Sequence, residues 1–245
     1  MVAHGADVAP ATVAAALRSL AARRLQREPI AYILGEREFW GLPFKVTPAV
    51  LVPRPDSETV IEAALSLLTD RNRAWRLLDL GVGSGCLLLT LLKELPEARG
   101  IGFEISPEAL DVARMNASSL GVEERTALLV GDWQQPDWED QVEGAFDLVV
   151  SNPPYIESAE IPRLMPEVAH FEPRQALDGG PDGLAAYRVI AAAGRRLLVP
   201  GGHLLVEVGQ GQAPEIADIF ASAGLVPLPS WKDLGGVERV VAARH

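Results

Sequence analysis

The chain has 245 residues, which is enough for one sizeable domain with an appendage but short for two full domains. Hydrophobic residues make up 48% of it and charged residues 22%, a globular mix that excludes disordered and fibrous classes. The formal net charge of −11 would repel a phosphate backbone, so a DNA-reading role is disfavoured unless a local basic patch overrides it.

Membrane, secretory and metal-cluster classes are disfavoured as well. No apolar run approaches the roughly 18 to 20 residues of a membrane span, and the N-terminus lacks the basic start and apolar core of a signal peptide. We therefore expect a cytoplasmic protein. Because Cys86 is the only cysteine, an internal disulfide and a cysteine-based metal cluster are excluded. The four histidines show no ligand spacing, so no bound metal is expected.

The N-terminal part predicts a helix followed by a hairpin. Apolar residues fall near helical spacing over residues 10–26, which indicates an amphipathic helix. Its Arg23, Arg24 and Arg27 could form a small basic patch, but we favour a solvated helix face. Residues 30–53 are rich in aromatic and branched side chains and are broken by glycines, which is typical of a small hairpin.

A second helix is expected to begin at Asp56-Ser57-Glu58 and to run to about Thr69, with Asp56 or Ser57 as its N-cap. We place a domain boundary just before this helix. Residues 1–52 then form a reduced N-terminal region of helix and hairpin, and residues 53–245 form the main domain.

Strands and helices alternate through most of the main domain, and the strands are almost continuously apolar. This pattern is typical of a parallel sheet with helices on both faces. The expected strands are 76–80, 100–105, 126–131, 146–151 and 203–208, and the expected helices are 84–94, 107–120, 184–198 and 212–223.

The C-terminus departs from this alternation. Residues 225–231 and 237–243 are two apolar strands with a turn between them and no helix, so they predict an antiparallel hairpin at one edge of the sheet. The predicted fold class is α/β, a doubly wound, mostly parallel seven-stranded sheet that ends in this hairpin. A long polar stretch between Tyr155 and Gly183 is expected to be a lid over the substrate, with a short helix at 161–168.

The segment from Leu77 to Gly85 predicts a strand that runs into a glycine loop and then a helix. Glycines let the backbone approach a ligand closely. The dinucleotide fingerprint needs a glycine where Cys86 stands, so a cofactor without a pyrophosphate fits better than NAD. We take this loop as cofactor-binding; its residues are Gly81, Val82, Gly83, Ser84 and Gly85.

Further candidate ligands follow the next two strands, at the carboxyl ends where open parallel sheets bind ligands. Glu104 suits bidentate hydrogen bonding to a ribose diol, Asp132 could accept from an adenine amino group, and Trp133 could lie against the purine ring. A nucleoside with an amino-acid tail, S-adenosylmethionine, fits this set. Taken singly, each residue has an ordinary alternative: Glu104 could be an exposed cap and Trp133 could be core packing.

The fourth strand stops at Asn152-Pro153-Pro154-Tyr155. Proline lacks the donor of a sheet ladder and restricts the residue before it, so this corner is rigid. The motif is similar to the signature of enzymes that methylate a planar, conjugated nitrogen. The Asn152 side-chain oxygen and the Pro153 carbonyl can accept both protons of such a nitrogen, and Tyr155 can stack on it, so that orientation supplies most of the catalysis. The alternative is a proline-terminated strand in which Asn152 only forms a turn.

The chain resembles the bacterial PrmC/HemK family, protein-(glutamine-N5) methyltransferases that modify peptide chain release factors. The resemblance extends over nearly everything after Glu28, and the segments before the sheet and after the Asn-Pro-Pro-Tyr corner are specific to this family. The matching segments are PIAYILGEREFWGLPFKV, VLVPRPDSETV, LLDLGVGSGCLLL, NPPYI, FEPRQALDGGPDGL and DLGGVERVV.

The resemblance implies a class I methyltransferase-like sheet that binds S-adenosylmethionine, and a release-factor partner whose Gly-Gly-Gln loop supplies the glutamine. It implies that residues 81–85, Glu104, Trp133 and Asn152 line the cofactor. It also implies that Asn152, Pro153, Pro154 and Tyr155 hold the substrate, with Asn152, Pro153 and Tyr155 as the catalytic set. Arg54 and Glu172 are expected to order the lid.

Two departures from the family pattern stand out. Glu104 occupies a position where the family usually has Asp, although the longer side chain should still reach a ribose diol. Only about one helix precedes Glu28, where family members carry a full helical domain, so we expect that domain to be truncated or reduced.

Three other functions remain open at this point. They are a methyltransferase of exocyclic amino groups in nucleic acid, a nicotinamide-dependent dehydrogenase, and a non-catalytic protein that only binds a partner. The first needs a basic surface, which the composition does not indicate, and the second is disfavoured by Cys86.

Overall fold

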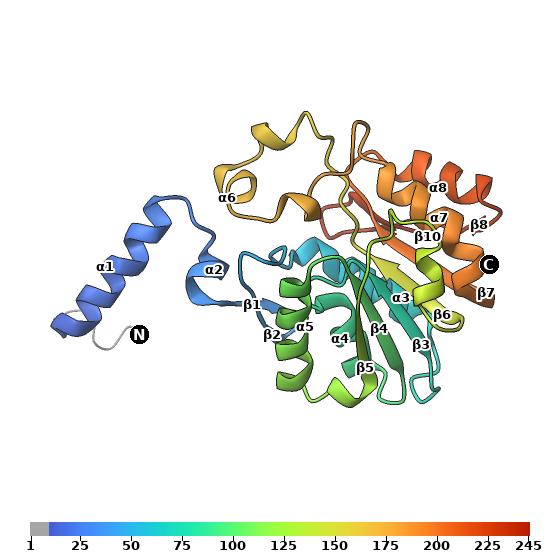
Figure 1. Cartoon of the computed structure of the whole chain (residues 1–245), viewed down its shortest axis with the longest axis horizontal. Coiled ribbons are helices and arrows are strands. Elements are labelled where there is room, and N and C mark those ends of the chain that lie inside the picture. Colours follow the sequence, from blue (N-terminus) through green and yellow to red (C-terminus); the bar gives the residue numbers. More distant parts are fainter. Residues whose placement is uncertain (1–9) are drawn as a thin grey trace.

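A computed structural model describes residues 10–245 of the chain. Its centre is one large sheet with helices on both faces, and a small hairpin and a projecting helix lie on the N-terminal side (Figure 1). The seven strands of the main path follow the spatial order β5 (Thr126–Val130), β4 (Arg99–Glu104), β3 (Arg76–Leu80), β6 (Phe146–Ser151), β7 (Leu198–Glu207), β10 (Glu238–Arg244) and β8 (Val226–Pro227).

The five strands from β5 to β7 are parallel, and β10 runs antiparallel to β7. This confirms the predicted fold class. The C-terminal hairpin differs in detail, because its first strand is broken into β8 and β9 (Trp231–Lys232), which pair with different parts of β10. A bulge at Glu238 and Val240 interrupts the pairing with β9. As a result β10 lies inside the sheet, and the short strands β8 and β9 pair with its outer side.

Helices cover the two faces of the sheet in separate groups (Figure 1). Apolar side chains repeat along each helix at the spacing that faces one side, so each buries a stripe against the sheet. The first group is α3 (Glu58–Leu67), α4 (Cys86–Glu94) and α5 (Pro107–Ser119), and the second is η3 (Trp138–Gln141), α7 (Ala185–Leu197) and α8 (Ala213–Ser222).

The predicted hairpin is present as β1 (Glu36–Phe39) and β2 (Leu42–Lys45), preceded by the short helix α2 (Ile30–Leu34). Phe39 and Phe44 are almost completely buried in the same core as α3 and α4. The hairpin is therefore packed onto the main sheet. The division of the chain at residues 52 and 53 stays a prediction.

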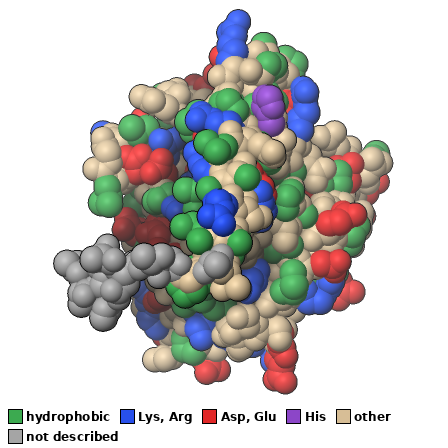
Figure 2. All heavy atoms as spheres, turned by 90° about the vertical axis from the view of Figure 1, so that its left-hand side faces the viewer, with side chains coloured by type: hydrophobic (Ala, Val, Ile, Leu, Met, Phe, Trp, Pro, Cys, Tyr) green, Lys and Arg blue, Asp and Glu red, His purple; other side chains and the backbone are tan. Residues whose placement is uncertain are grey.

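The predicted N-terminal helix is present as α1 (Ala11–Leu25), and it projects away from the rest of the molecule (Figure 1). Its apolar side chains Val13, Leu17 and Leu25 are more than half exposed instead of buried. Figure 2, which faces this end of the molecule, shows apolar and basic side chains interspersed. No helix within residues 10–245 is both long and apolar enough to cross a membrane, and the cytoplasmic location stays a prediction.

The long segment after β6 carries only short helical turns, which are η4 (Ile161–Arg163), α6 (Pro166–Ala169) and η5 (Arg174–Ala176). The helix expected at 161–168 is thus broken into η4 and α6, because Pro166 can begin a helix but cannot continue one. Remaining short turns elsewhere are η1 (Pro55–Ser57) and η2 (Glu123–Arg125).

Asn116, fully buried on α5, connects the hairpin to the glycine loop. Its side-chain oxygen accepts from the Lys45 N–H at 2.7 Å, and its Nδ2 donates to the carbonyls of Lys45 at 3.0 Å and Ser84 at 2.8 Å. One amide therefore satisfies three backbone groups from two segments that are far apart in the chain.

We expect Asn116→Ala to lower the free energy of unfolding by about 2 to 4 kcal/mol, because buried backbone groups lose their partners. Urea denaturation of the variant measures this. Ser118→Ala, an exposed change on the same helix, is the matched control and should leave stability nearly unchanged. An equal, small effect of both substitutions would contradict the connecting role of Asn116.

Candidate functional site

The site lies between β3 and β6, where the order in which the chain adds strands to the sheet reverses. Strand β3 pairs with β4 on one side and β6 on the other. The helices that follow β3 and β4 cover one face of the sheet, whereas the helix that follows β6, α7, covers the other. Such a switch point opens a crevice at the carboxyl ends of the strands. Leu80 is in register with Ser151, so the residues that follow them, Gly81 and Asn152, emerge side by side.

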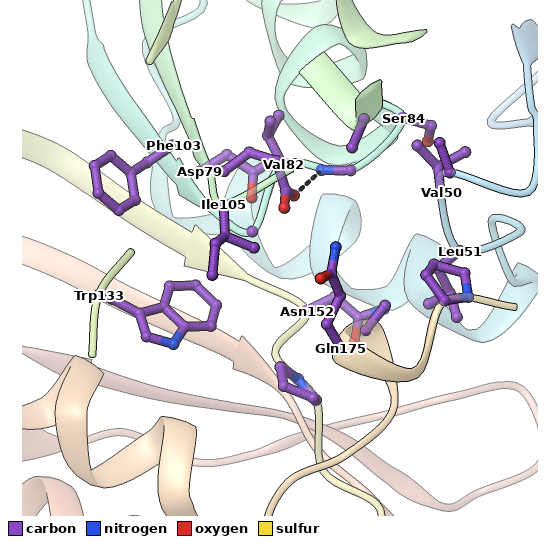
Figure 3. A pocket seen from close by; sticks show the side chains of 18 of the residues that line it. Val50, Leu51, Asp79, Val82, Ser84, Phe103, Ile105, Trp133, Asn152 and Gln175 are labelled. Atoms are coloured by element: carbon purple, nitrogen blue, oxygen red, sulfur yellow. Dashed lines mark hydrogen bonds between the residues drawn. The ribbon is translucent and has the colours of Figure 1, made fainter. Parts of the chain in front are cut away.

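A cavity of about 680 Å³ occupies this crevice. Figure 3 shows Asp79, Phe103, Ile105, Trp133 and Asn152 arranged around it. Most residues predicted to bind the cofactor line its wall; these are Gly81, Val82, Gly83, Ser84, Glu104, Asp132, Trp133 and Asn152. Pro154 also lines it, whereas Gly85, Pro153 and Tyr155 are not among the residues that line it.

The glycine loop adopts backbone geometry that only glycine takes without strain. Gly81, Gly83 and Gly85 have φ angles of +76°, +52° and +83°. A Cβ on Gly81 would lie 3.1 Å from Cη2 of Trp133, and one on Gly85 would lie 2.6 Å from Cδ1 of Leu89. Gly81 thus permits the Trp133 ring to approach the loop closely, and Gly85 leaves room for the Leu89 side chain of α4.

Glu104, at the end of β4, holds the glycine loop from the neighbouring parallel strand. One carboxylate oxygen accepts from the Gly83 N–H at 3.0 Å, marked by the dashed line in Figure 3, and the other accepts from the Ser106 N–H at 3.1 Å. Burial raises the pKa of this carboxyl, and the backbone donors oppose that rise. Glu104 therefore faces the cavity with its position fixed and with remaining lone pairs available to a diol.

Asp132 and Trp133 follow β5 and complete one end of the cavity. The Asp132 carboxylate accepts from the Gln134 N–H at 2.8 Å, which holds the turn in place. Trp133 is partly buried against the core beneath α7, so it is both core packing and cavity wall. Core packing of Trp133 is confirmed, and its contact with the purine ring stays a prediction.

Asp79, one residue before the end of β3, is a further wall residue that no sequence motif indicated. It lines the cavity yet is 1% exposed, and its Oδ1 has no hydrogen-bond partner among the described residues. Its Oδ2 accepts only a long bond of 3.3 Å from the Leu88 N–H. Burial raises the pKa of Asp79 to about 7, and nearby Glu104 adds to the rise. A buried carboxyl in this state attracts a cationic ligand group.

The Asn-Pro-Pro-Tyr corner presents two acceptors. Asn152 Nδ2 donates to the Ser57 hydroxyl at 3.3 Å, and the Asn152 oxygen has no partner among the described residues. No described group donates to the Pro153 carbonyl either, although Pro153 itself is buried. Tyr155 packs partly into the core, and burial raises the pKa of its hydroxyl to about 12.

The segment between Tyr155 and Gly183 folds over the cavity, as predicted. Pro173, Arg174, Gln175 and Ala176 line the wall opposite the glycine loop. Arg54 binds Glu172, whose side chain is almost fully buried, so the predicted pair joins the start of η1 to this lid.

A second tie reaches the lid from the projecting helix. Arg24 and Arg27 of α1 and the residues after it both bind Glu167 of α6, at 2.8 and 3.3 Å, while Arg23 binds Glu28. The basic trio is thus largely ion-paired and half exposed, closer to a solvated face than to a free basic patch.

The sequence indicates only weakly that several of the wall residues belong to a site. For Asp79, the indication is an aspartate inside the otherwise apolar run from Leu77 to Leu80. Phe103 and Ile105 flank Glu104, and Ile105 is 48% exposed, which is unusual for an apolar residue beside a buried strand. Asp56 or Ser57 was expected to cap α3, but Ser57 at the N-cap position makes no capping bond with its side chain and lies at the cavity instead. No group of three or more potential metal ligands occurs within residues 10–245.

Family models match two parts of the chain. A methyltransferase domain matches residues 71–222, and a PrmC N-terminal domain matches residues 1–35. A release factor glutamine methyltransferase from Rhodospirillum rubrum is 50% identical over 95% of this chain and 69% of its own length. The chain belongs to this family.

Other relatives carry the same description. The release factor glutamine methyltransferase of Bradyrhizobium diazoefficiens is 46% identical over the whole of this chain and 82% of its own length. That of Geobacter sulfurreducens is 46% identical over 94% of this chain and 78% of its own. The predicted family and enzyme class, a methyltransferase that uses S-adenosylmethionine, are confirmed.

Solved structures support the fold alone. A methyltransferase from Pyrococcus furiosus aligns with a TM-score of 0.59 at 18% identity, over 92% of this chain and 98% of that one. The catalytic domain of hMettl16, solved with an RNA hairpin, aligns with a TM-score of 0.68 at 14% identity, over 87% and 80%. The sheet is thus that of class I methyltransferases.

We expect Asp79→Asn to stabilise the ligand-free enzyme in alkaline solution. The pKa of Asp79 is about 7 in the folded protein against an ordinary value of 3.8, so ionisation costs stability as pH rises between these values. Above about pH 7, ionised Asp79 lowers the stability of the wild type by its full amount, whereas the neutral side chain of the variant has no ionisation cost. Urea denaturation at pH 5 and pH 8 measures the difference, and a wild type that stays as stable as the variant at pH 8 would contradict it.

The same substitution should weaken S-adenosylmethionine binding by about 10- to 100-fold, because a charge-assisted contact is lost. Titration calorimetry of wild type and variant measures this. Asp147→Asn, a buried carboxyl at the other end of the sheet, is the matched control and should leave the affinity unchanged. Equal affinities for wild type and Asp79→Asn would exclude a cofactor contact.

Proposed function

We propose that this enzyme transfers a methyl group from S-adenosylmethionine to the side-chain amide nitrogen, N5, of the glutamine in the Gly-Gly-Gln loop of a peptide chain release factor. The observation that carries the proposal is the pair of free acceptors, the Asn152 oxygen and the Pro153 carbonyl, beside a cofactor cavity. The description that the 42–50% identical relatives share supports the choice of substrate.

The cavity wall fits S-adenosylmethionine. Glu104 would bind the ribose diol, Trp133 would contact the purine, and the glycine loop would follow the amino-acid tail. The unpartnered oxygen of Asp79 suits an ammonium group, and the four acids that line the cavity, Asp79, Glu104, Asp132 and Asp178, suit a cationic ligand. When bound, the cofactor supplies a methyl group on a positively charged sulfur, which is reactive toward a well-aimed nitrogen.

Orientation is the main contribution that the corner can make. The nitrogen of a carboxamide is a poor nucleophile because its lone pair is delocalised. Acceptors on Asn152 and Pro153 can take both N–H groups and hold the amide plane so that the nitrogen faces the cavity. Fixing such a geometry lowers the barrier by removing translational and rotational freedom before reaction. Because Asn152 is neutral, it aligns the substrate without adding a strong charge next to the sulfonium.

The lid contributes by shielding the site. Residues 173–176 cover the cavity opposite the glycine loop, held through Glu172 by Arg54. Exclusion of water strengthens the hydrogen bonds that align the substrate.

A methyl transfer assay with purified release factor tests the proposal. Mass spectrometry should show one added methyl group, located on the glutamine of the Gly-Gly-Gln loop. A methyl group on another residue or no transfer would refute it. Transfer to the amino groups of a nucleic acid, offered in the same reaction, would favour the alternative substrate class, which the formal charge of −11 disfavours.

We expect Asn152→Ala to lower kcat about 100-fold or more while changing cofactor affinity only modestly, because the lost acceptor acts on the aligned substrate. Single-turnover rates at saturating cofactor measure the first effect and calorimetry the second. A variant that keeps its turnover would show that the corner does not orient the glutamine.

A further inference from the structure

The Asn-Pro-Pro-Tyr corner has few attachments of its own. Pro153 and Pro154 have no backbone N–H, so neither can donate a hydrogen bond that would hold the corner in place. The first end of the corner is fixed by the sheet, where Ser151 is in register with Leu80. The other end, Tyr155, lies outside the sheet. The position of the substrate acceptors therefore depends on what holds Tyr155.

Gln212, the N-cap residue of α8, binds Tyr155 through its side-chain amide. Its Nε2 donates to the Tyr155 carbonyl at 3.1 Å, and its Oε1 accepts from the Gly209 N–H at 2.9 Å. Because one partner is an acceptor and the other is a donor, the two bonds also determine which end of the amide faces which partner. One side chain thus links the corner to the turn that follows β7.

Two buried glycines leave room for this link. A Cβ on Gly183 would meet the Tyr155 carbonyl oxygen and would lie 2.8 Å from Nε2 of Gln212, so a side chain there would occupy the space in which the bond forms. A Cβ on Gly209 would lie 3.1 Å from Cδ2 of Tyr155. Gln212 therefore holds both the Tyr155 carbonyl and the residue against which the Tyr155 ring packs.

The end of the lid lies directly against the corner. The Ile156 N–H donates to the Leu177 carbonyl at 3.0 Å, and the Gly179 N–H donates to the Ile156 carbonyl at 2.8 Å. A Cβ on Gly179 would lie 2.8 Å from both the Pro154 oxygen and the Tyr155 Cα, so the two backbones are in contact. Corner and lid end therefore form one unit, which the glutamine amide attaches to the turn before α8.

We propose that Gln212 is a positioning residue for methyl transfer, which fixes the Tyr155 end of the corner. It thereby sets where the Asn152 oxygen and the Pro153 carbonyl lie relative to the substrate. Because prolines restrict the chain between these residues, a displacement at Tyr155 is passed on to the acceptors. Gln212 is not among the residues that line the cavity, so it acts through the corner. This inference rests on the proposed function.

Two substitutions of Gln212 separate its two hydrogen bonds. Gln212→Met has a similar length and loses both bonds. Gln212→Glu keeps an acceptor for the Gly209 N–H, but its carboxylate cannot donate to the Tyr155 carbonyl. A role limited to the turn would leave Gln212→Glu close to wild type, whereas a positioning role makes both variants defective.

Steady-state kinetics at saturating cofactor measure the effect. Both Gln212 variants should lower kcat about 10- to 100-fold, because a small misplacement of the aligned amide slows the reaction by this order. The KM for release factor should rise less than kcat falls, and calorimetry should show an unchanged Kd for S-adenosylmethionine. Gln210→Met, an exposed change in the same turn, is the matched control and should keep wild-type constants.

Gly179→Ala tests the same unit from the side of the lid. The added methyl group would meet backbone atoms of Pro154 and Tyr155, which cannot yield without moving the corner, so kcat should fall about 10-fold or more although Gln212 is intact. Gly121→Ala, after α5, is the control, because nothing lies within 4 Å of its added methyl group, and it should keep kcat.

A readout independent of turnover is hydrogen exchange of single N–H groups, measured by NMR on ¹⁵N-labelled enzyme with S-adenosylhomocysteine. The Ile156 and Gly179 N–H groups, which bond between corner and lid, should exchange about 10-fold or more faster in both Gln212 variants. Those of β6, and all of them in Gln210→Met, should keep their rates. This result stands even if wild type fails to methylate release factor, a failure that would count against the proposed function alone.

Wild-type kcat in folded Gln212→Met, Gln212→Glu or Gly179→Ala would overturn the inference. So would a Kd for S-adenosylmethionine that rises as much as kcat falls, or unchanged exchange at Ile156 in both Gln212 variants. Thermal denaturation of every variant separates misfolding from displacement of the corner. If Gln212→Met does not fold, Gln212→Glu and Gly179→Ala still decide the question through kcat and the exchange rates.

Discussion

The parallel pairing of β3 with β6 is the constraint on which the rest of the site depends. Leu80 is in register with Ser151, and the Ser151 hydroxyl donates to the Leu80 carbonyl at 2.6 Å, so the two strands end together. The glycine loop and the Asn-Pro-Pro-Tyr corner therefore leave the sheet at the same level. A slip of this register would separate the cofactor from the substrate acceptors, whatever the side chains were.

Buried carboxyls give the site its chemical character. Asp79, Glu104 and Glu207 lie at or just before the ends of three parallel strands, each almost completely enclosed, and burial raises the pKa of each. Unpaired buried charge is costly, so a protein keeps such groups where a ligand or a fixed orientation requires them. A cationic cofactor and a neutral amide substrate both suit a site of this kind.

The segments around the sheet connect the site to the N-terminal side of the molecule. Asn116 ties the hairpin to the glycine loop, Arg54 ties the start of α3 to the lid, and Glu167 ties the lid to α1. These contacts join pieces that are far apart in the chain. The segments that enclose the cavity are thus also bound to the N-terminal hairpin, to Arg54 or to α1.

The sequence by itself determined the fold class, the order of the elements and most of the cavity wall. Apolar periodicity shows which strands are buried, glycines mark positive φ angles, and prolines mark where β6 must stop, all of which are local properties. The tertiary structure alone decided the place of Asp79 and Ser57 in the cavity wall. Local rules offered Asp56 or Ser57 as a helix cap and assigned nothing to Asp79, because a buried hydrogen bond or a raised pKa depends on neighbours that are distant in the chain.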